Sequence, residues 1–296
     1  MSSLPPEPTT DVLAFASIQD RKRLLELFPI AKLRTQWPDQ SGTKSELCFW
    51  IASNADSEEI VDFIGENFGC CKQHIVVFSR EGGNEAPEID FPGGHVLWAD
   101  EHGGVNRVLY GVEFDYEVVL REPLEEAHLR FVWPIRLDHT GSNVILRFVI
   151  LEKNISTYFE GRSYYVSGKS IEEKNIIEAV GNAIEGLEPT DLHKGVKKLW
   201  EDGVIDSPRA KFKKTLSTAS EAMDEDRLIK EHNPELYEIV IESPLFNTLF
   251  YVIPDRGLEV SAFSVDPSKG LIGFPRYSDD IGDTDQLVAA ILDHNQ

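Results

Sequence analysis

The residues best suited to hold a charged ligand lie between His193 and Lys214, in a chain whose formal net charge is −22. This segment has seven basic residues against three acidic ones, so it carries +4 while the rest of the chain carries −26. Lysine and arginine side chains that are set apart in this way can bind phosphate or carboxylate groups through charge-assisted hydrogen bonds. The candidate anion- or partner-binding residues are Lys194, Lys197, Lys198, Arg209, Lys211, Lys213 and Lys214.

The spacing of apolar residues predicts two short helices that position these basic side chains. The first is expected over 191–202, with Leu192 and Val196 on its buried side and the lysines facing largely away. Ser207-Pro208 is typical of a helix start and predicts the second helix, so that the pair resembles helix-turn-helix geometry. The alternative is that this basic helical pair, residues 193–214, is a solvated surface that folds against the protein's own acidic residues.

A weaker candidate for phosphate binding is Lys169 with Ser170, at a predicted junction between a strand and a helix. Gly168-Lys169-Ser170 matches the end of a phosphate-binding loop, but the full pattern also requires a glycine five residues before Gly168. That position is Ser163, and the sequence therefore favours a helix cap made by Ser170 over nucleotide hydrolysis. A single phosphate held by Lys169 at the helix N-terminus is the alternative.

Metal-binding and nucleophilic residues are sparse and poorly spaced. His95 and His102 are separated by six strand residues at about 3.3 Å each, too far apart to share one metal ion. Cys48, Cys70 and Cys71 are odd in number, with two adjacent, which is a poor disulfide framework and favours buried, reduced thiols. We therefore expect neither a metal nor a cofactor.

The first part of the chain is predicted to place a strand–helix–strand unit after an N-terminal helix. Capping residues and apolar periodicity are the basis of this prediction. The expected elements are a flexible tail over 1–11, a helix over 18–28, a strand over 46–52, a helix over 56–69 and a strand over 74–79.

From His95 onward, alternating apolar and polar residues predict an antiparallel meander. Pro134 lacks an N–H group and predicts that its strand lies at a sheet edge. The expected strands are 95–100, 105–111, 114–120, 129–137, 144–151 and 164–166.

The remainder of the chain is predicted to be helical after Ser170 and then to form strands over 237–243, 246–253 and 258–265, before a closing helix over 285–293. The expected fold class is therefore α+β: mainly an antiparallel meander, with a helical segment and a second, smaller sheet toward the C-terminus. Two domains are expected after the tail. They are an α+β domain over 12–168 with the meander, and a domain over 169–296 with the helical pair and a three-stranded sheet.

Composition places the chain among ordinary globular proteins. A hydrophobic share of 41% and a charged share of 27% exclude wholesale disorder. The N-terminal residues do not resemble a signal peptide, and no apolar run is long enough to cross a bilayer. We expect a cytoplasmic protein that does not associate with membranes.

The sequence favours a non-catalytic interaction or regulatory protein, a component of a larger assembly that docks a protein partner through its polarised charge. One alternative is a cation-dependent hydrolytic enzyme whose site is assembled from residues distant in the sequence. Another is a nucleic-acid-associated factor that uses 193–214, where seven basic residues predict weak, salt-sensitive binding. Catalysis is left open, with the weight of the motifs against it.

Overall fold

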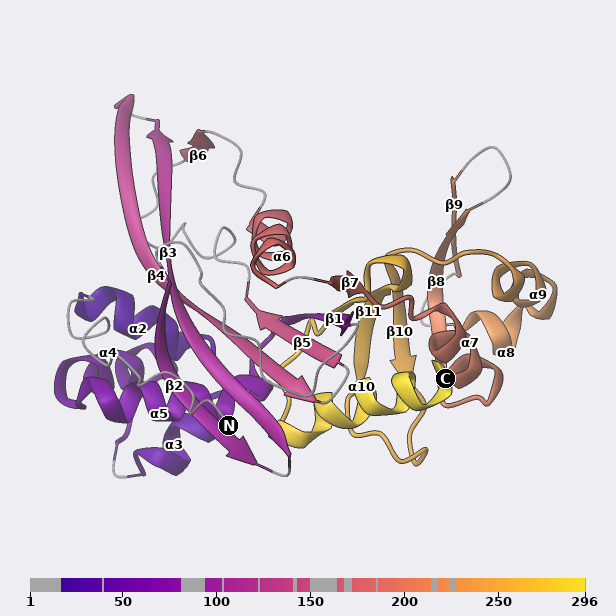
Figure 1. The fold of residues 1–296 in the computed structure, drawn as a ribbon, viewed down its shortest axis with the longest axis horizontal. Coiled ribbons are helices and arrows are strands. Elements are labelled where there is room, and N and C mark those ends of the chain that lie inside the picture. Colours follow the sequence, from indigo (N-terminus) through magenta and orange to yellow (C-terminus); the bar gives the residue numbers. More distant parts are fainter. Residues whose placement is uncertain are drawn as a thin grey trace. The chain divides into compact units, whose positions relative to one another are not determined.

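The computed structural model is α+β and mainly antiparallel sheet, as the sequence predicts (Figure 1). The predicted tail, residues 1–11, lies outside the residues that the structure describes. Those residues are 17–38, 40–80, 94–102, 104–121, 123–140, 143–149, 164–167, 172–184, 186–213, 218–223 and 227–295.

The chain divides into two compact units. Unit 1 is Met1–Asn67 with Arg80–Glu188, and unit 2 is Phe68–Ser79 with Pro189–Gln296. Short segment β7 (Leu187–Pro189) lies at the boundary in the sequence. The folding of 12–168 and 169–296 as separate domains stays a prediction.

Two helices of unit 1, those that begin at Ile18 and Lys44, have side-chain N-caps. The hydroxyl of Ser17 accepts a hydrogen bond from the amide of Asp20, and Thr43 forms a capping box with Glu46. The helices are α2 (Ile18–Glu26), α3 (Ile30–Gln36), α4 (Lys44–Asn54), α5 (Ser57–Asn67) and α6 (Glu172–Ala183).

The strand predicted over 46–52 is wrong, because these residues lie within α4. The capping box satisfies amide groups of the first turn, which favours a helix from Lys44 onward. Buried residues recur four positions apart, Leu47 with Ile51 and Cys48 with Ala52, which is the helical period. Phe49 and Trp50 also make the exposed side of α4 apolar, so the segment lacks the polar face that marks a surface helix.

The predicted meander is confirmed as the sheet of unit 1. The hairpin predicted around 101–104 pairs β2 with β3, with His95 opposite Gly111. Strands predicted separately over 105–111 and 114–120 form one strand, which pairs with β4 along its full length. The strands are β2 (Gly94–His102), β3 (Val105–Leu120), β4 (Glu125–Thr140), β5 (Asn143–Phe148) and β6 (Tyr164–Ser167), which pairs with β3.

Pro134 does not mark a sheet edge, because β4 lies between β3 and β5. The prediction from its missing N–H is therefore wrong for the strand as a whole. Pairing between β4 and β5 extends only to Ile135, so Pro134 lies just beyond that ladder.

Helix α5 packs against the sheet of unit 1 through a close approach at Gly65. A Cβ atom at Gly65 would lie 2.4 Å from the Trp98 ring, so only glycine fits there. Arg136 Nη1 on β4 donates to the Gly65 carbonyl at 3.3 Å. The aromatic ring of Phe63 on the same helix contacts Phe28 at 5.0 Å between ring centroids.

A buried ion cluster joins β4 to β5 on this face. Arg136 and Arg147 are direct cross-strand partners, and Asp138 lies two residues along β4 on the same face. Asp138 Oδ2 accepts from Arg136 Nη2 at 2.9 Å and from Arg147 Nε at 2.7 Å, and the three side chains are at most 4% exposed. Burial raises the pKa of Asp138, but the two guanidinium groups outweigh it and hold that pKa below its ordinary value.

Unit 2 contains an antiparallel sheet in the order β1-β12-β11-β10-β8-β9. Its strands are β1 (His74–Arg80), β8 (Ile205–Lys213), β9 (Thr218–Ala222), β10 (Thr248–Val252), β11 (Ala262–Asp266) and β12 (Leu271–Gly273). Its helices are α7 (His193–Glu201), α8 (Ile229–His232), α9 (Pro234–Glu242) and α10 (Ile281–Asn295), with 3₁₀ turns at Phe68–Cys70 and Pro267–Lys269.

The helix predicted from Ser207-Pro208 is wrong: this segment forms β8 and the start of the β8–β9 hairpin. Ala210 and Phe212 are buried while their neighbours are more exposed, which is the period of a strand. The strand predicted over 237–243 is also wrong, because residues 237–242 belong to α9 and Ser243 is its C-cap. Asn233 accepts from the amide of Leu236, and this cap with Pro234 at the first turn favours a helix.

Helices α7 and α10 pack closely at Gly195. A Cβ atom there would lie 2.0 Å from the carbonyl oxygen of Ile291. At the other end of α7, the buried Trp200 ring contacts Phe250 of β10 at 5.0 Å between centroids. The helix is thus held between α10 and the sheet.

We predict that Gly195→Ala lowers the free energy of unfolding by about 1–3 kcal/mol, because the added methyl group forces the two helices apart. Gly181→Ala in α6 is the matched control, since a Cβ there meets no atom within 4 Å. It should stabilise the protein by about 0.5–1 kcal/mol through helix propensity. Urea unfolding measures both, and equal effects would contradict the packing described here.

Asp138→Asn should lower the free energy of unfolding by about 3–5 kcal/mol, because it removes the counter-charge of two buried arginines. The folded-state pKa of Asp138 is depressed, so its stabilisation is fully present above the unfolded pKa of about 4 and is lost as the pH falls below it. Urea unfolding between pH 3 and 7 should show that this part of the pH dependence disappears in the variant. Asp202→Asn, which breaks an exposed ion pair with Lys198, should leave the pH dependence of the free energy of unfolding largely unchanged.

Candidate partner-binding surface

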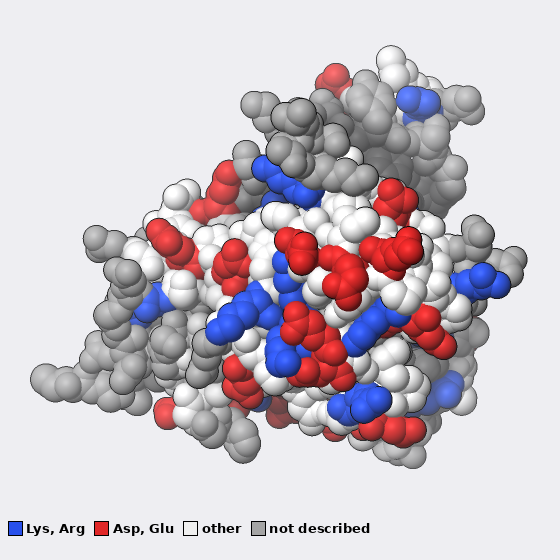
Figure 2. Space-filling model, turned by 90° about the vertical axis from the view of Figure 1, so that its right-hand side faces the viewer, with Lys and Arg blue, Asp and Glu red and all other residues white. Residues whose placement is uncertain are grey.

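Helix α7 carries three of the predicted basic residues on the side opposite its buried face. Lys198 Nζ lies 2.8 Å from Asp202 and 4.0 Å from Glu201, so its charge is matched within the helix end. Burial lowers the pKa of Lys197, and the nearby Glu201 opposes that shift. Lys194 is exposed at the start of the helix. Figure 2 shows the side that bears α7, α8 and α9, where basic and acidic side chains are interleaved.

Strand β8 carries the other described basic residues in a line. Arg209 and Lys213 are exposed and Lys211 is half-buried, all on the face opposite Ala210 and Phe212. Successive members of this line lie two residues apart, about 6.6 Å along the strand. None of the three forms an ion pair with a residue that the structure describes. We call Arg209, Lys211 and Lys213 the basic row.

Strand β9 places small side chains beside the basic row. Arg209 is opposite Ala222, Lys211 is opposite Ser220 and Lys213 is opposite Thr218. Cross-strand partners stand on the same face, so no carboxylate of β9 faces the row. Glu221 is opposite Ala210 and therefore belongs to the other face.

On its other side, the row is bordered by a partly apolar stretch of β10. Leu249 is opposite Arg209, and Tyr251 follows on the same face of β10; both side chains are half-buried. Asp206, the acidic residue nearest in sequence, is buried and accepts a hydrogen bond from Trp200 Nε1 at 2.8 Å. Its carboxylate is therefore engaged with α7.

The prediction of a basic helical pair is corrected in its second half. Helix α7 is confirmed, but Arg209, Lys211 and Lys213 stand on a strand, so the resemblance to helix-turn-helix geometry does not hold. The strand brings together three cations that a helix would have spread around its axis. Lys214, Lys169 and Ser170 lie outside the described residues.

The expectation of buried cysteines is confirmed: Cys48, Cys70 and Cys71 are buried, and none of the three is in a disulfide. Burial raises the pKa of the Cys48 thiol to about 12, with a further contribution from nearby Glu26. A thiol so far from ionisation is a poor nucleophile.

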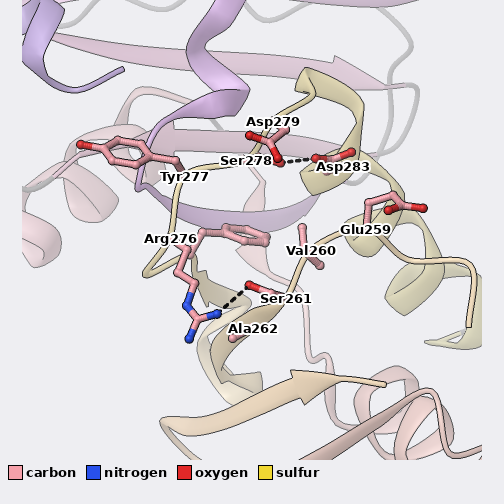
Figure 3. Close-up of a pocket in the computed structure, with 10 residues that line it drawn as sticks. Glu259, Val260, Ser261, Ala262, Arg276, Tyr277, Ser278, Asp279 and Asp283 are labelled. Carbon is pink, nitrogen blue, oxygen red and sulfur yellow. Dashed lines mark hydrogen bonds between the residues drawn. The ribbon is translucent and has the colours of Figure 1, made fainter. Parts of the chain in front are cut away.

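A pocket of about 160 Å³ lies in unit 2 where the turn before α10 meets the segment before β11 (Figure 3). The hydroxyl of Ser278 donates to the buried carboxylate of Asp283, and Arg276 Nη1 donates to the Ser261 hydroxyl at 3.3 Å. The lining residues are Glu259, Val260, Ser261, Ala262, Phe274, Arg276, Tyr277, Ser278, Asp279 and Asp283.

The serine–aspartate pair of this pocket is explained by the start of α10. Asp283 also accepts from the amide of Asp280 at 3.1 Å, and Asp280 accepts from the amide of Gly282 at 2.8 Å. Two side chains that satisfy amides of a first helical turn form a capping arrangement. Ser278 thus extends a helix cap.

The residues that the structure describes contain neither a metal-ligand cluster nor a helix suited to span a membrane. Within them, no group of three His, Cys, Asp or Glu side chains is placed to hold a metal ion. Their helices include none with the length and apolar character needed to span a bilayer.

Comparison with known proteins does not add to these observations. No family model, curated protein or solved structure matches the chain.

We predict that the native protein at pH 8 leaves all three cysteines unreacted with Ellman's reagent over minutes, because the thiols are buried and Cys48 stays protonated. The protein unfolded in urea should release three equivalents of thionitrobenzoate, which serves as the control. One fast-reacting thiol in the native protein would instead point to a reactive cysteine site.

Proposed function

We propose that this chain is a partner-binding protein, a component of a larger assembly that docks an acidic region of another protein on the basic row of β8. The observation that carries the proposal is the row itself: Arg209, Lys211 and Lys213 share one solvent-facing side of a strand and have no ion pair with a described residue. An aligned set of cations gains interaction energy when a partner supplies the counter-charge.

The acidic remainder of the chain supports a protein partner over nucleic acid. At a net charge of −22, the far field repels polyanions, and the three cations of the basic row would have to overcome it. A partner with a local acidic segment meets much less repulsion. The same polarity orients the approach, because the basic row attracts an acidic segment at short range.

In this proposal, the chain acts by recognising a partner protein and not by catalysis, and it does so in the cytoplasm. The use of Ser278 and Asp283 in a helix cap supports recognition over catalysis, because that pair already has a structural task. Three buried cysteines that form no disulfide support a reducing compartment, where thiols persist.

The proposal predicts that the triple variant Arg209→Gln, Lys211→Gln, Lys213→Gln loses about 1–3 kcal/mol of binding free energy, since exposed ion pairs contribute up to about 1 kcal/mol each. The measurement is affinity capture from the native host, performed with the intact chain at low and at high salt. Wild-type capture should weaken at high salt, because the screening length falls from about 10 Å at 0.1 M to about 3 Å at 1 M.

A second triple variant provides the matched control: Lys72→Gln, Arg256→Gln, Lys269→Gln. These residues are exposed and belong to unit 2, as the basic row does. Their substitution removes three positive charges, the same number as in the basic-row variant. This control should retain every partner that the wild type captures. Unchanged capture by the basic-row variant would show that the row is only solvated surface.

A further inference from the structure

Strand β9 forms an open edge of the sheet in unit 2. It pairs with β8 and, among the described strands, with no other (Figure 1). Four of its five residues are exposed and the fifth is half-buried. An edge strand presents N–H and C=O groups that another extended chain can use.

The hydrogen bonds of β8 show which groups of β9 face that edge. The amide of Lys211 donates to Thr248 Oγ1 at 3.2 Å, and the amide of Lys213 donates to the Pro244 carbonyl at 2.9 Å, both away from β9. In an antiparallel pair, opposite residues either exchange both backbone bonds or turn both groups outward. Ser220, opposite Lys211, therefore turns its N–H and C=O to the open edge. By the same alternation, the outward-facing residues are Thr218, Ser220 and Ala222.

These outward residues stand on the same face as the basic row. Arg209 Nε donates to the Ser220 hydroxyl at 3.3 Å, so the arginine side chain already lies across β9 toward its edge. A strand added at that edge would lie two strand spacings from β8, about 9.6 Å. Long lysine and arginine side chains can cross the small residues of β9 and meet carboxylates on such a strand.

Charge selects the occupant of the edge. A second copy of β9 would bring its own basic row beside the first, and like charges on neighbouring strands are unfavourable. Nucleic acid has no backbone amides to continue the ladder and is repelled by the net charge of −22. An extended peptide with carboxylates at every second position satisfies both the backbone edge and the basic row.

We infer that β9 binds an extended acidic peptide segment as an added strand, with its alternate Glu or Asp side chains directed to the basic row. This inference rests on the proposed function and adds the class of partner and the mode of binding. Main-chain hydrogen bonds to Thr218, Ser220 and Ala222 hold the segment, and the basic row sets its preference for acidic residues.

The first test uses a fluorescein-labelled nine-residue peptide with glutamate at alternate positions between threonine and valine, titrated with the full-length chain by fluorescence anisotropy. A peptide of the same composition with its glutamates consecutive is the control, and it should bind at least tenfold more weakly. Equal binding of the two peptides would overturn the alternate-residue recognition inferred here.

The decisive variant is Ser220→Pro, which removes an amide on the open edge and leaves the amides that face β8 in place. It should weaken binding about tenfold, the equivalent of roughly 1.4 kcal/mol. Ser220→Ala is the matched control, because it keeps the amide and loses only the hydroxyl that Arg209 contacts. It should stay within about threefold of the wild type.

Peptides methylated on alternate backbone amides test the main-chain hydrogen bonds to β9 without altering the protein. They therefore test strand addition even if Ser220→Pro does not fold. Only one edge of an added strand faces β9, so methylation of one alternate set should abolish binding while methylation of the other set should not. Equal effects of the two sets would overturn strand addition.

The outcomes separate this inference from the proposed function. Binding that survives Ser220→Pro and either methylation, yet is lost in the basic-row variant, would overturn strand addition and leave the proposed function standing. Binding that survives the basic-row variant would overturn both. Tighter binding of a labelled single-stranded DNA, or a dimer abolished by Ser220→Pro, would replace the acidic peptide by nucleic acid or a second copy and so overturn the inference.

Discussion

The hydrogen bonds on both sides of β8 determine which way each of its residues faces, and the functional surface depends on this register. Ala210 and Phe212 are held in the core of unit 2, so the residues that alternate with them along β8 must face outward. Those outward positions carry the basic row, and the residues opposite them turn their amides to the open edge of β9. A slip of one residue would bury the cations, which makes this register strongly specified.

The pairing of positive side chains with carboxylates differs with their burial. Arg136 and Arg147 lie in the interior of unit 1 and share the carboxylate of Asp138, because an unpaired ion in that setting costs several kcal/mol. Lys198 is exposed and pairs with Asp202 at the end of its own helix. The basic row lies at the surface and carries no such cost, so it can stay without an ion pair to any residue that the structure describes. In the proposed function, a partner supplies the counter-charge.

Local signals predicted much of the fold. The apolar stripes of α2 and α7 and the alternation that forms β3 and β4 each belong to one segment and can be recognised in isolation. The segments over 46–52 and 237–243 were assigned the wrong type because short apolar runs fit a buried strand as well as a helix. In both cases, the cap before the run decided the outcome, at Thr43 and at Asn233.

The set of basic residues that stands apart from the acidic remainder can be read from the sequence alone, since charge and chain position are local properties. The alignment of Arg209, Lys211 and Lys213 on one strand depends on tertiary contacts. Ser207-Pro208 is compatible with a helix start, and the segment that follows is too short for its apolar residues to distinguish the helical period from the strand period. The hairpin pairing with β9 and the hydrogen bonds to Thr248 and Pro244 settle the choice. Thr248 and Pro244 lie far along the chain from the residues they hold.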